Sequence, residues 1–180
     1  MKRFGMLCLL FAVIVLMFGV VSADAADYSG LFDTEYTQTV DSAFTFAFVG
    51  DTQKVAYFAP EKMSIIYDWI VENAEAKNLK FVAGLGDITD NTEKYEWEAA
   101  ISAIQKLDGV VPYSLVRGNH DGVFQFVKYV NYEAYTKQLA GMYKNVMNTY
   151  HLVIVGTLKY LFLNLDHGPS DDVLPGRVRL

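Results

Sequence analysis

Residues 80–90 read KFVAGLGDITD, and this stretch decides the fold. Residues 80–85 form an apolar run with the length of a buried strand, and Gly86-Asp87 ends the run abruptly. A glycine at that point lets the backbone turn sharply away from the strand. The stretch therefore predicts a strand with a polar side chain at its carboxyl end.

The same arrangement occurs before and after this stretch. Residues 43–49 (AFTFAFV) predict a Phe-rich strand that ends at Gly50-Asp51. Residues 112–116 predict a third strand, which ends at Arg117-Gly118-Asn119-His120-Asp121. Residues 149–155 and 158–165 then predict a hairpin around Gly156-Thr157.

Helical patterns over residues 60–77 and 93–107 separate the first three strands. Their expected apolar faces consist of Ile65, Ile66, Trp69 and Ile70 in the first helix and of Trp97, Ala100, Ile101 and Ile104 in the second. Successive strand–loop–helix units indicate an α/β fold with parallel strands.

The composition is typical of a globular protein with a packed core. The chain has 180 residues, of which 52% are hydrophobic and 20% charged, and this excludes a disordered protein and suggests one domain. The net charge of −6 argues against a general affinity for nucleic acid or anionic membranes, so no nucleic-acid-binding surface is expected.

The N-terminus has the pattern of a secretory signal peptide. Lys2 and Arg3 precede an apolar run over residues 7–21, and Val21-Ser22-Ala23 supplies small residues for cleavage. We therefore predict a signal peptide over residues 1–23, an exposed leader over residues 24–42 and a domain over residues 43–180. The expected location is secreted, extracellular or periplasmic, with no stable membrane span after cleavage. An uncleaved membrane anchor is the alternative, because the apolar run is nearly long enough to cross a bilayer.

Candidate ligands fall at the same point of each strand–loop–helix unit. Ligands of open α/β sheets bind beyond the carboxyl ends of the strands, so Asp51, Asp87 and Asn119 are expected to converge. Two neighbouring carboxylates repel each other unless a cation lies between them. Asp, Asn and His side chains suit Mn, Fe, Zn or similar divalent ions. The sequence thus predicts a metal site.

Each segment also has a simpler interpretation. A Gly-Asp at a strand end is commonly a turn or a helix cap. On that interpretation Asp90 and Asp121 cap the segments that follow them, and Asn119 is a turn residue. The ordered occurrence of the three segments on successive units favours a shared site.

Gly-Asp-x-x-Asp followed by Gly-Asn-His-Asp, each after an apolar strand, resembles the calcineurin-like metallophosphoesterase family from Phe44 to the chain end. The resemblance implies an α/β fold of two β-sheets flanked by helices. It also implies hydrolysis of phosphate esters by water that two divalent ions (Mn, Fe, Zn or Mg) activate. Asp51 and Gln53 would bind the first ion, Asp87 would bridge both, and Asn119 would bind the second and orient the substrate phosphate.

The same resemblance assigns the acid–base residues. His120 would be the general acid toward the leaving oxygen, and Asp121 would hold it in orientation. Arg117 is either a fork donor to phosphate or part of a surface ion pair. Asp90 matches the motif in a supporting role.

The sequence departs from the family pattern at two places. The first motif reads Asp51-Thr52-Gln53 where Asp-x-His is common, and a Gln oxygen is a harder ligand that favours Mg or Mn. The later histidine loops of the family do not appear. His151 is expected to be packed within a strand, whereas His167 is either a loop residue or a neighbour of the site.

The end of the sequence suggests a domain truncated at its C-terminus. Ser170-Asp171-Asp172 predicts a helix start that Pro175-Gly176 breaks. Three functions stay open: a secreted hydrolase of phosphate esters, a catalytically inactive fragment with a weak metal site, and a non-enzymatic surface-binding module. No Gly-x-Gly-x-x-Gly or Gly-x-Ser-x-Gly is present, which disfavours a Rossmann-type nucleotide binder and a serine hydrolase.

Overall fold

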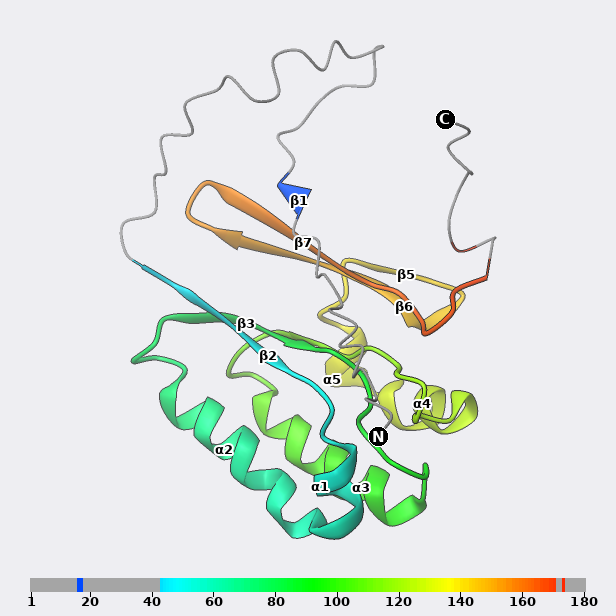
Figure 1. The fold of residues 1–180 in the computed structure, drawn as a ribbon. Coiled ribbons are helices and arrows are strands. Elements are labelled where there is room, and N and C mark those ends of the chain that lie inside the picture. Colours follow the sequence, from blue (N-terminus) through cyan, green and yellow to red (C-terminus); the bar gives the residue numbers. More distant parts are fainter. Residues whose placement is uncertain (1–15, 18–42, 171–172, 174–180) are drawn as a thin grey trace, which may run out of the picture.

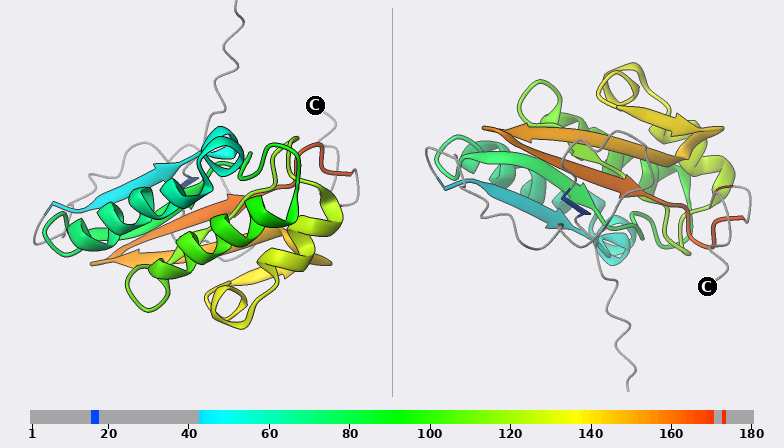
Figure 2. Two further views of the ribbon diagram at one scale, coloured as in Figure 1. Left: turned by 90° about the horizontal axis from the view of Figure 1, so that it is seen from below. Right: turned by 90° about the horizontal axis from the view of Figure 1, so that it is seen from above.

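The computed structural model describes residues 16–17, 43–170 and 173. The predicted leader and most of the predicted signal peptide lie outside these residues, as does most of the predicted C-terminal helix start. The described residues form two stacked β-sheets, with helices on the outer face of one of them (Figures 1 and 2). This confirms the expected α/β architecture of two sheets flanked by helices. No helix in the described part of the chain is long and apolar enough to cross a membrane.

The first sheet contains the three strands predicted from the Gly-Asp and Gly-Asn segments. They are β2 (Thr45–Val49), β3 (Leu79–Gly84) and β4 (Tyr113–Ser114), in the order β2-β3-β4. Both pairings are parallel. The carboxyl ends of all three strands therefore lie at one edge of the sheet, as the sequence predicts.

Helices pack against the outer face of this sheet. α2 (Met63–Asn73) follows a short 3-10 turn, η2 (Pro60–Lys62), and α3 (Lys94–Ile104) continues into η3 (Gln105–Leu107). The sequence did not predict α1 (Gln53–Phe58), because a helix of six residues is too short to show a clear apolar period.

The second sheet is antiparallel and has the order β1-β7-β6-β5. Its main part is the predicted hairpin of β6 (Asn145–Val155) and β7 (Leu158–Asn164), with Gly156 at φ 60° in the turn. β5 (Gly141–Tyr143) pairs with β6, and β1 (Leu16–Met17) pairs with β7. α4 (Val123–Val130) and α5 (Glu133–Thr136) connect the two sheets.

The two sheets meet through aromatic side chains. Phe81 of β3 stacks on Phe162 of β7 with ring centroids 4.1 Å apart. Phe46 of β2 meets the edge of the same Phe162 ring at 5.2 Å. Large aromatic surfaces contribute most of the burial in such a layer, and this accounts for the Phe-rich strand of the sequence.

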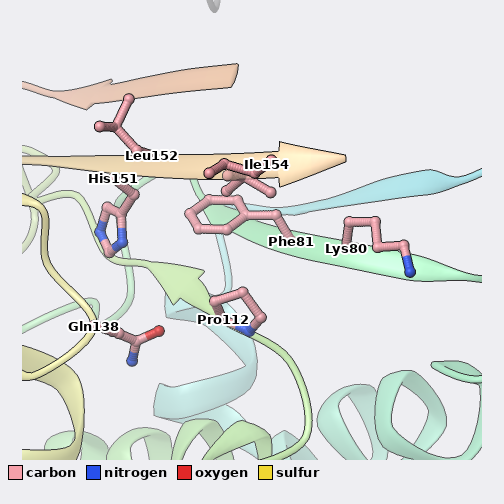
Figure 3. Close-up of a pocket in the computed structure, with 8 residues that line it drawn as sticks. Lys80, Phe81, Pro112, Gln138, His151, Leu152 and Ile154 are labelled. Carbon is pink, nitrogen blue, oxygen red and sulfur yellow. The ribbon is translucent and has the colours of Figure 1, made fainter. Parts of the chain in front are cut away.

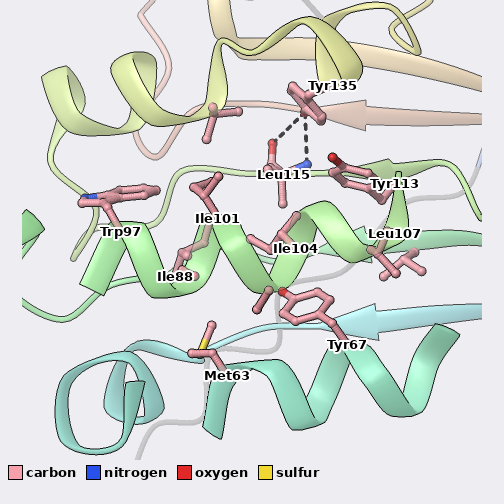
Figure 4. Packing of buried hydrophobic residues seen from close by; sticks show 14 of the residues in the cluster. Met63, Tyr67, Ile88, Trp97, Ile101, Ile104, Leu107, Tyr113, Leu115 and Tyr135 are labelled. Atoms are coloured by element: carbon pink, nitrogen blue, oxygen red, sulfur yellow. Dashed lines mark hydrogen bonds between the residues drawn. The ribbon is translucent and has the colours of Figure 1, made fainter. Parts of the chain in front are cut away.

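A second apolar core lies between the parallel sheet and the helices (Figure 4). Trp97, Ala100, Ile101 and Ile104 of α3 are buried there, as predicted. The prediction for α2 was partly wrong, because Ile65 and Trp69 are 62% and 54% exposed. The buried face of α2 is formed instead by Met63, Tyr67 and Ile70. A helix with apolar residues around most of its circumference does not reveal in sequence which face meets the sheet.

Trp97→Ala is expected to lower the free energy of unfolding by about 3–5 kcal/mol, because it leaves a cavity in a closed core. Trp69→Ala is the matched control, with an expected loss of about 1 kcal/mol or less, since Trp69 is half exposed and Lys77 lies over its ring. Urea unfolding followed by circular dichroism measures both. Equal losses for the two variants would contradict the packing described for α3.

Candidate functional site

Hydrogen bonds and a close backbone contact join the three loops at the carboxyl ends of β2, β3 and β4. The backbone N–H of Asp51 donates to the Gly86 carbonyl at 3.1 Å, and that of Gln53 donates to the Asp87 carbonyl at 2.9 Å. At Gly118 a Cβ atom would lie 2.0 Å from Asp87 Oδ1, so only glycine lets the third loop approach this carboxylate. The loops that carry Asp51, Asp87 and Asn119 therefore meet at one place.

Both predicted carboxylate ligands have an unusual backbone conformation. Asp51 and Asp87 lie in the left-handed region, with φ angles of 55° and 50°, next to Gly86 at 94°. Non-glycine residues occupy this region rarely, and each instance costs about 1–3 kcal/mol where the surrounding structure enforces it. Such strained residues cluster at functional sites. Asn78, Thr92 and Lys144 also have positive φ angles, so two of the five described non-glycine residues in this region are predicted metal ligands.

Gln53 connects the loop after β2 to the loop after β3. In the orientation that satisfies its side-chain amide, the nitrogen donates to the carbonyl of Asp51 at 2.8 Å and to that of Asp87 at 3.1 Å. A histidine at this position lacks an amide that can donate to two carbonyls at once. The interaction gives Gln53 a structural function, and coordination through its oxygen stays a prediction.

Among the predicted ligands, Asp51 and Asn119 are exposed, whereas Gln53 and Asp87 are half-buried. Within residues 43–170, the side chains of Asp51 and Asn119 form no hydrogen bond or ion pair, and Asp87 Oδ1 accepts only from the His120 backbone at 3.1 Å. Two carboxylates and two amides form an oxygen donor set, which fits a hard divalent cation such as Mg or Mn. The donor chemistry therefore fits a metal. Among the described residues, however, no three His, Cys, Asp or Glu side chains lie close enough to share one ion.

His120 is held by Asp90. Its Nδ1 lies 3.0 Å from the Asp90 carbonyl oxygen and 3.3 Å from Asp90 Oδ1. The same carboxylate accepts from Lys54 Nζ at 2.7 and 2.8 Å. Asp90 does not cap α3, because the N-cap residue is Glu93. The buried Glu96 accepts from the backbone N–H of Asp90 at 3.1 Å and of Glu93 at 2.8 Å.

The hydrogen bonds of Asp121 are made to the loops and not to His120, so the described contacts do not support the orienting function predicted for it. Asp121 is 1% exposed, and its carboxylate accepts from the backbone N–H of Ile88, Thr89 and Gly118 at 3.1, 2.8 and 3.0 Å and from the Thr89 hydroxyl at 3.0 Å. Burial raises the pKa of this carboxyl, and the hydrogen bonds oppose the rise. Asp121 therefore holds the loop after β3 to the loop after β4. Gly122 occupies the capping position before α4.

Arg117 connects the loop after β4 to the residues that follow β7. Its Nε donates to Asp166, at the end of β7. One of its terminal nitrogens donates to the carbonyls of Gly118 and Asp121 at 3.2 and 3.0 Å, and the other donates to the carbonyl of His167 at 3.0 Å. Because both ends of the guanidinium are engaged and the side chain is 10% exposed, the predicted contact with phosphate is not supported. The predicted alternative, an ion pair, is present with Asp166, but it is largely buried, since the two side chains are 10% and 15% exposed.

The remaining histidines lie apart from the three loops. His151 is buried between the two sheets, as predicted. His167 is exposed, and its carbonyl is held by Arg117 at the border of the site. The sequence analysis missed Lys54 and Asp166. Asp166 follows β7 as Asp87 follows β3, so the same strand-end argument could have found it, whereas nothing in the sequence marks Lys54.

Comparison with known proteins agrees with this geometry. Residues 44–175 match the sequence pattern of the family described as Calcineurin-like phosphoesterase. The chain belongs to this family. The match confirms the resemblance carried by the Gly-Asp-x-x-Asp and Gly-Asn-His-Asp segments.

A relative of this calcineurin-like phosphoesterase has no assigned function. The chain is 30% identical over 139 residues to the "Uncharacterized protein YvnB" of Bacillus subtilis (strain 168). The match covers 72% of this chain and 11% of the relative, so the chain spans only a small part of the relative's length.

Asp121→Ala is expected to lower the free energy of unfolding by about 3 kcal/mol or more, because it leaves buried backbone N–H groups without an acceptor. Asp51→Asn is the matched control, since Asp51 is exposed and asparagine also tolerates a positive φ. Its expected change is about 0.5 kcal/mol. Thermal and urea unfolding measure both variants. An Asp121→Ala protein as stable as the parent would show that the carboxylate does not fasten the loops.

Proposed function

We propose that this calcineurin-like phosphoesterase is a secreted hydrolase of phosphate esters with His120 as its general acid. The observation that carries the proposal is the pairing of His120 with Asp90 beside the loops of Asp51, Asp87 and Asn119. A general acid needs a fixed ring and a partner that stabilises its protonated form. The exposed mouth of the site supplies the space for a substrate.

The hydrogen bonds of His120 assign its two nitrogens. Nδ1 faces the Asp90 carbonyl oxygen, which only accepts, so Nδ1 carries a hydrogen. Nε2 has no hydrogen-bond partner within the described residues and is left for the substrate. When His120 is protonated, the Asp90 carboxylate stabilises the charge, and Nε2–H can donate its proton to the leaving oxygen.

We infer that Asp51, Gln53, Asp87 and Asn119 hold two divalent cations at the strand ends. Bound there, the cations would offset the aspartate charges, polarise the phosphoryl group and activate water at neutral pH. Asp87 lies where the first and third loops meet, which supports it as the shared ligand. Asn119 is exposed beside His120 and is placed to contact the phosphate as well.

A metal-binding fold without catalysis is the second candidate. It is favoured by one observation: within the described residues the donor set contains two carboxylates and no metal-facing imidazole. Such a site binds one hard ion weakly, and two-ion hydrolysis would then be absent. Activity measurements separate the two candidates.

With Mn added, the purified chain is expected to hydrolyse p-nitrophenyl phosphate or bis-p-nitrophenyl phosphate, and EDTA is expected to abolish the activity. His120→Ala should lower kcat by about 100-fold to 10,000-fold, the usual contribution of a general acid. Asp87→Asn should abolish both activity and Mn binding measured by calorimetry. Asp68→Asn, on α2, is the control for loss of a carboxylate outside the site. Mn binding without hydrolysis in the parent protein would select the non-catalytic candidate.

Asp90→Asn keeps the backbone carbonyl that holds Nδ1 but removes the charge beside it. We expect kcat to fall about tenfold to 100-fold with little change in KM, because a supporting residue acts on the transition state through its partner. The double variant with His120→Ala should lose no more activity than His120→Ala alone. Additive losses in the double variant would show that Asp90 acts independently of His120.

A further inference from the structure

The cavity between the two sheets does not serve the hydrolytic site. Its volume is about 220 Å³, and it lies beside Phe81, near the start of β3, and beside His151 of β6 (Figure 3). Both ring nitrogens of His151 are closed off from solvent. The loops that carry the predicted ligands follow the opposite, carboxyl ends of the parallel strands. The organic part of a substrate that meets His120 therefore contacts side chains at the mouth of the site.

One exposed cation lies at this mouth, on the same carboxylate as His120. Lys54, on α1, donates from Nζ to Asp90 Oδ1 and Oδ2 at 2.7 and 2.8 Å. His120 Nδ1 lies 3.3 Å from the same Oδ1. The distance from the ammonium nitrogen to the imidazole nitrogen is therefore no greater than the sum of the two distances to Oδ1. Lys54 is thus a direct neighbour of the His120 ring.

Lys54 has room and capacity to contact a ligand. Its side chain is 62% exposed, whereas that of Asp90 is 9% exposed. An ammonium group has three N–H donors, and within the described residues Asp90 is the only hydrogen-bond partner of Lys54, so one donor is left. Arg117, the other basic residue that bonds to these loops, is engaged at both ends of its guanidinium. Lys54 therefore supplies the available positive charge at the mouth.

The charges around Asp90 do not cancel when His120 is in its acid form. A protonated His120 and Lys54 then face one carboxylate and leave one excess positive charge. The neighbouring Glu96 is fully buried, and its carboxylate accepts from the backbone N–H groups of Asp90, Asn91 and Glu93, so it does not compete for Lys54. The excess charge is open to an anion that arrives from solvent.

Aromatic side chains lie next to Lys54. Tyr57 and Phe58 follow it by three and four residues, which places them on the same side of α1. Their ring centroids are 4.6 Å apart, and Phe58 is 74% exposed. Tyr95 of α3 adjoins them, with its hydroxyl 3.5 Å from the Tyr57 carbonyl oxygen. The surface beside the ammonium group therefore suits a planar organic group.

We propose that Lys54 determines specificity for phosphate esters whose leaving group carries its own negative charge close to the leaving oxygen. This inference rests on the proposed function, because His120 defines the side on which the leaving group departs. The anion of the leaving group, a carboxylate or a second phosphate, pairs with the remaining N–H of Lys54. An exposed ion pair of this kind changes affinity by about threefold to fivefold.

The test compares 3-carboxyphenyl phosphate with 3-carbamoylphenyl phosphate, which have nearly the same shape but differ by one negative charge. With Mn added, the ratio of their kcat/KM values is expected to be about threefold to fivefold higher in the parent and in Lys54→Arg than in Lys54→Met. A ratio within one variant cancels any effect of Lys54 on Asp90 and His120, because both substrates experience it. High salt should reduce the preference, since the pair is exposed to solvent.

Lys106→Met is the matched control. Lys106 lies in η3, at the far end of α3 from the loops, and is ion-paired with Asp68 at 2.5 Å. This variant also loses a paired lysine and should keep the parent ratio. A ratio that falls equally in Lys106→Met and Lys54→Met would show that only the net charge of the protein matters, which would overturn the proposal.

The corresponding phosphonates give a reading that does not need catalysis. Their binding in the presence of Mg is followed by NMR of the ¹⁵N-labelled full chain. The affinity ratio of the carboxyl to the carbamoyl analogue should be about threefold to fivefold higher in the parent than in Lys54→Met. Binding with this preference but without hydrolysis of the esters would overturn the proposed hydrolysis and support Lys54 as the anion-binding residue. Equal ratios in the parent and Lys54→Met in either assay would overturn the inference. A parent that binds neither phosphonate and hydrolyses neither ester would overturn both proposals.

Discussion

The site depends on one buried carboxylate. Asp121 belongs to the third loop but accepts hydrogen bonds from Ile88 and Thr89 of the second and from Gly118 of its own. These contacts fix the distance between the loop after β3 and the loop after β4. They also account for the close approach of Gly118 to Asp87, which brings the second and third loops together.

The polar residues of the site divide into two groups with different functions. Asp121, Glu96 and Arg117 are buried or nearly so, and their charges are satisfied mainly by backbone groups of the loops. Asp51, Asn119 and His120 are exposed. The buried charges hold the loops, and the loops present the exposed side chains. Buried charges can do this because an unpaired charge in the interior is expensive, so each one requires a defined set of partners.

The two sheets contribute differently to function. The parallel sheet aligns three strand ends and so builds the hydrolytic site. The antiparallel sheet covers the inner face of the parallel sheet through the contact of Phe162 with Phe81. Asp166, which follows β7, accepts a hydrogen bond from Arg117. β5 pairs with only part of β6.

The sequence by itself determined the fold class, the three parallel strands and the hairpin, because strand length, apolar runs and Gly-Asp turns are local properties. It also determined the place of Asp51, Asp87 and Asn119, since parallel strands must end at a common edge. Only the tertiary structure decided that Asp90, and not Asp121, holds His120. Both carboxylates follow a strand-end glycine within four residues, and which of them is buried depends on contacts with residues 30 or 33 positions away. The exposed face of α2 and the hydrogen bonds of Arg117 were likewise decided by packing between distant segments, which a local pattern does not contain.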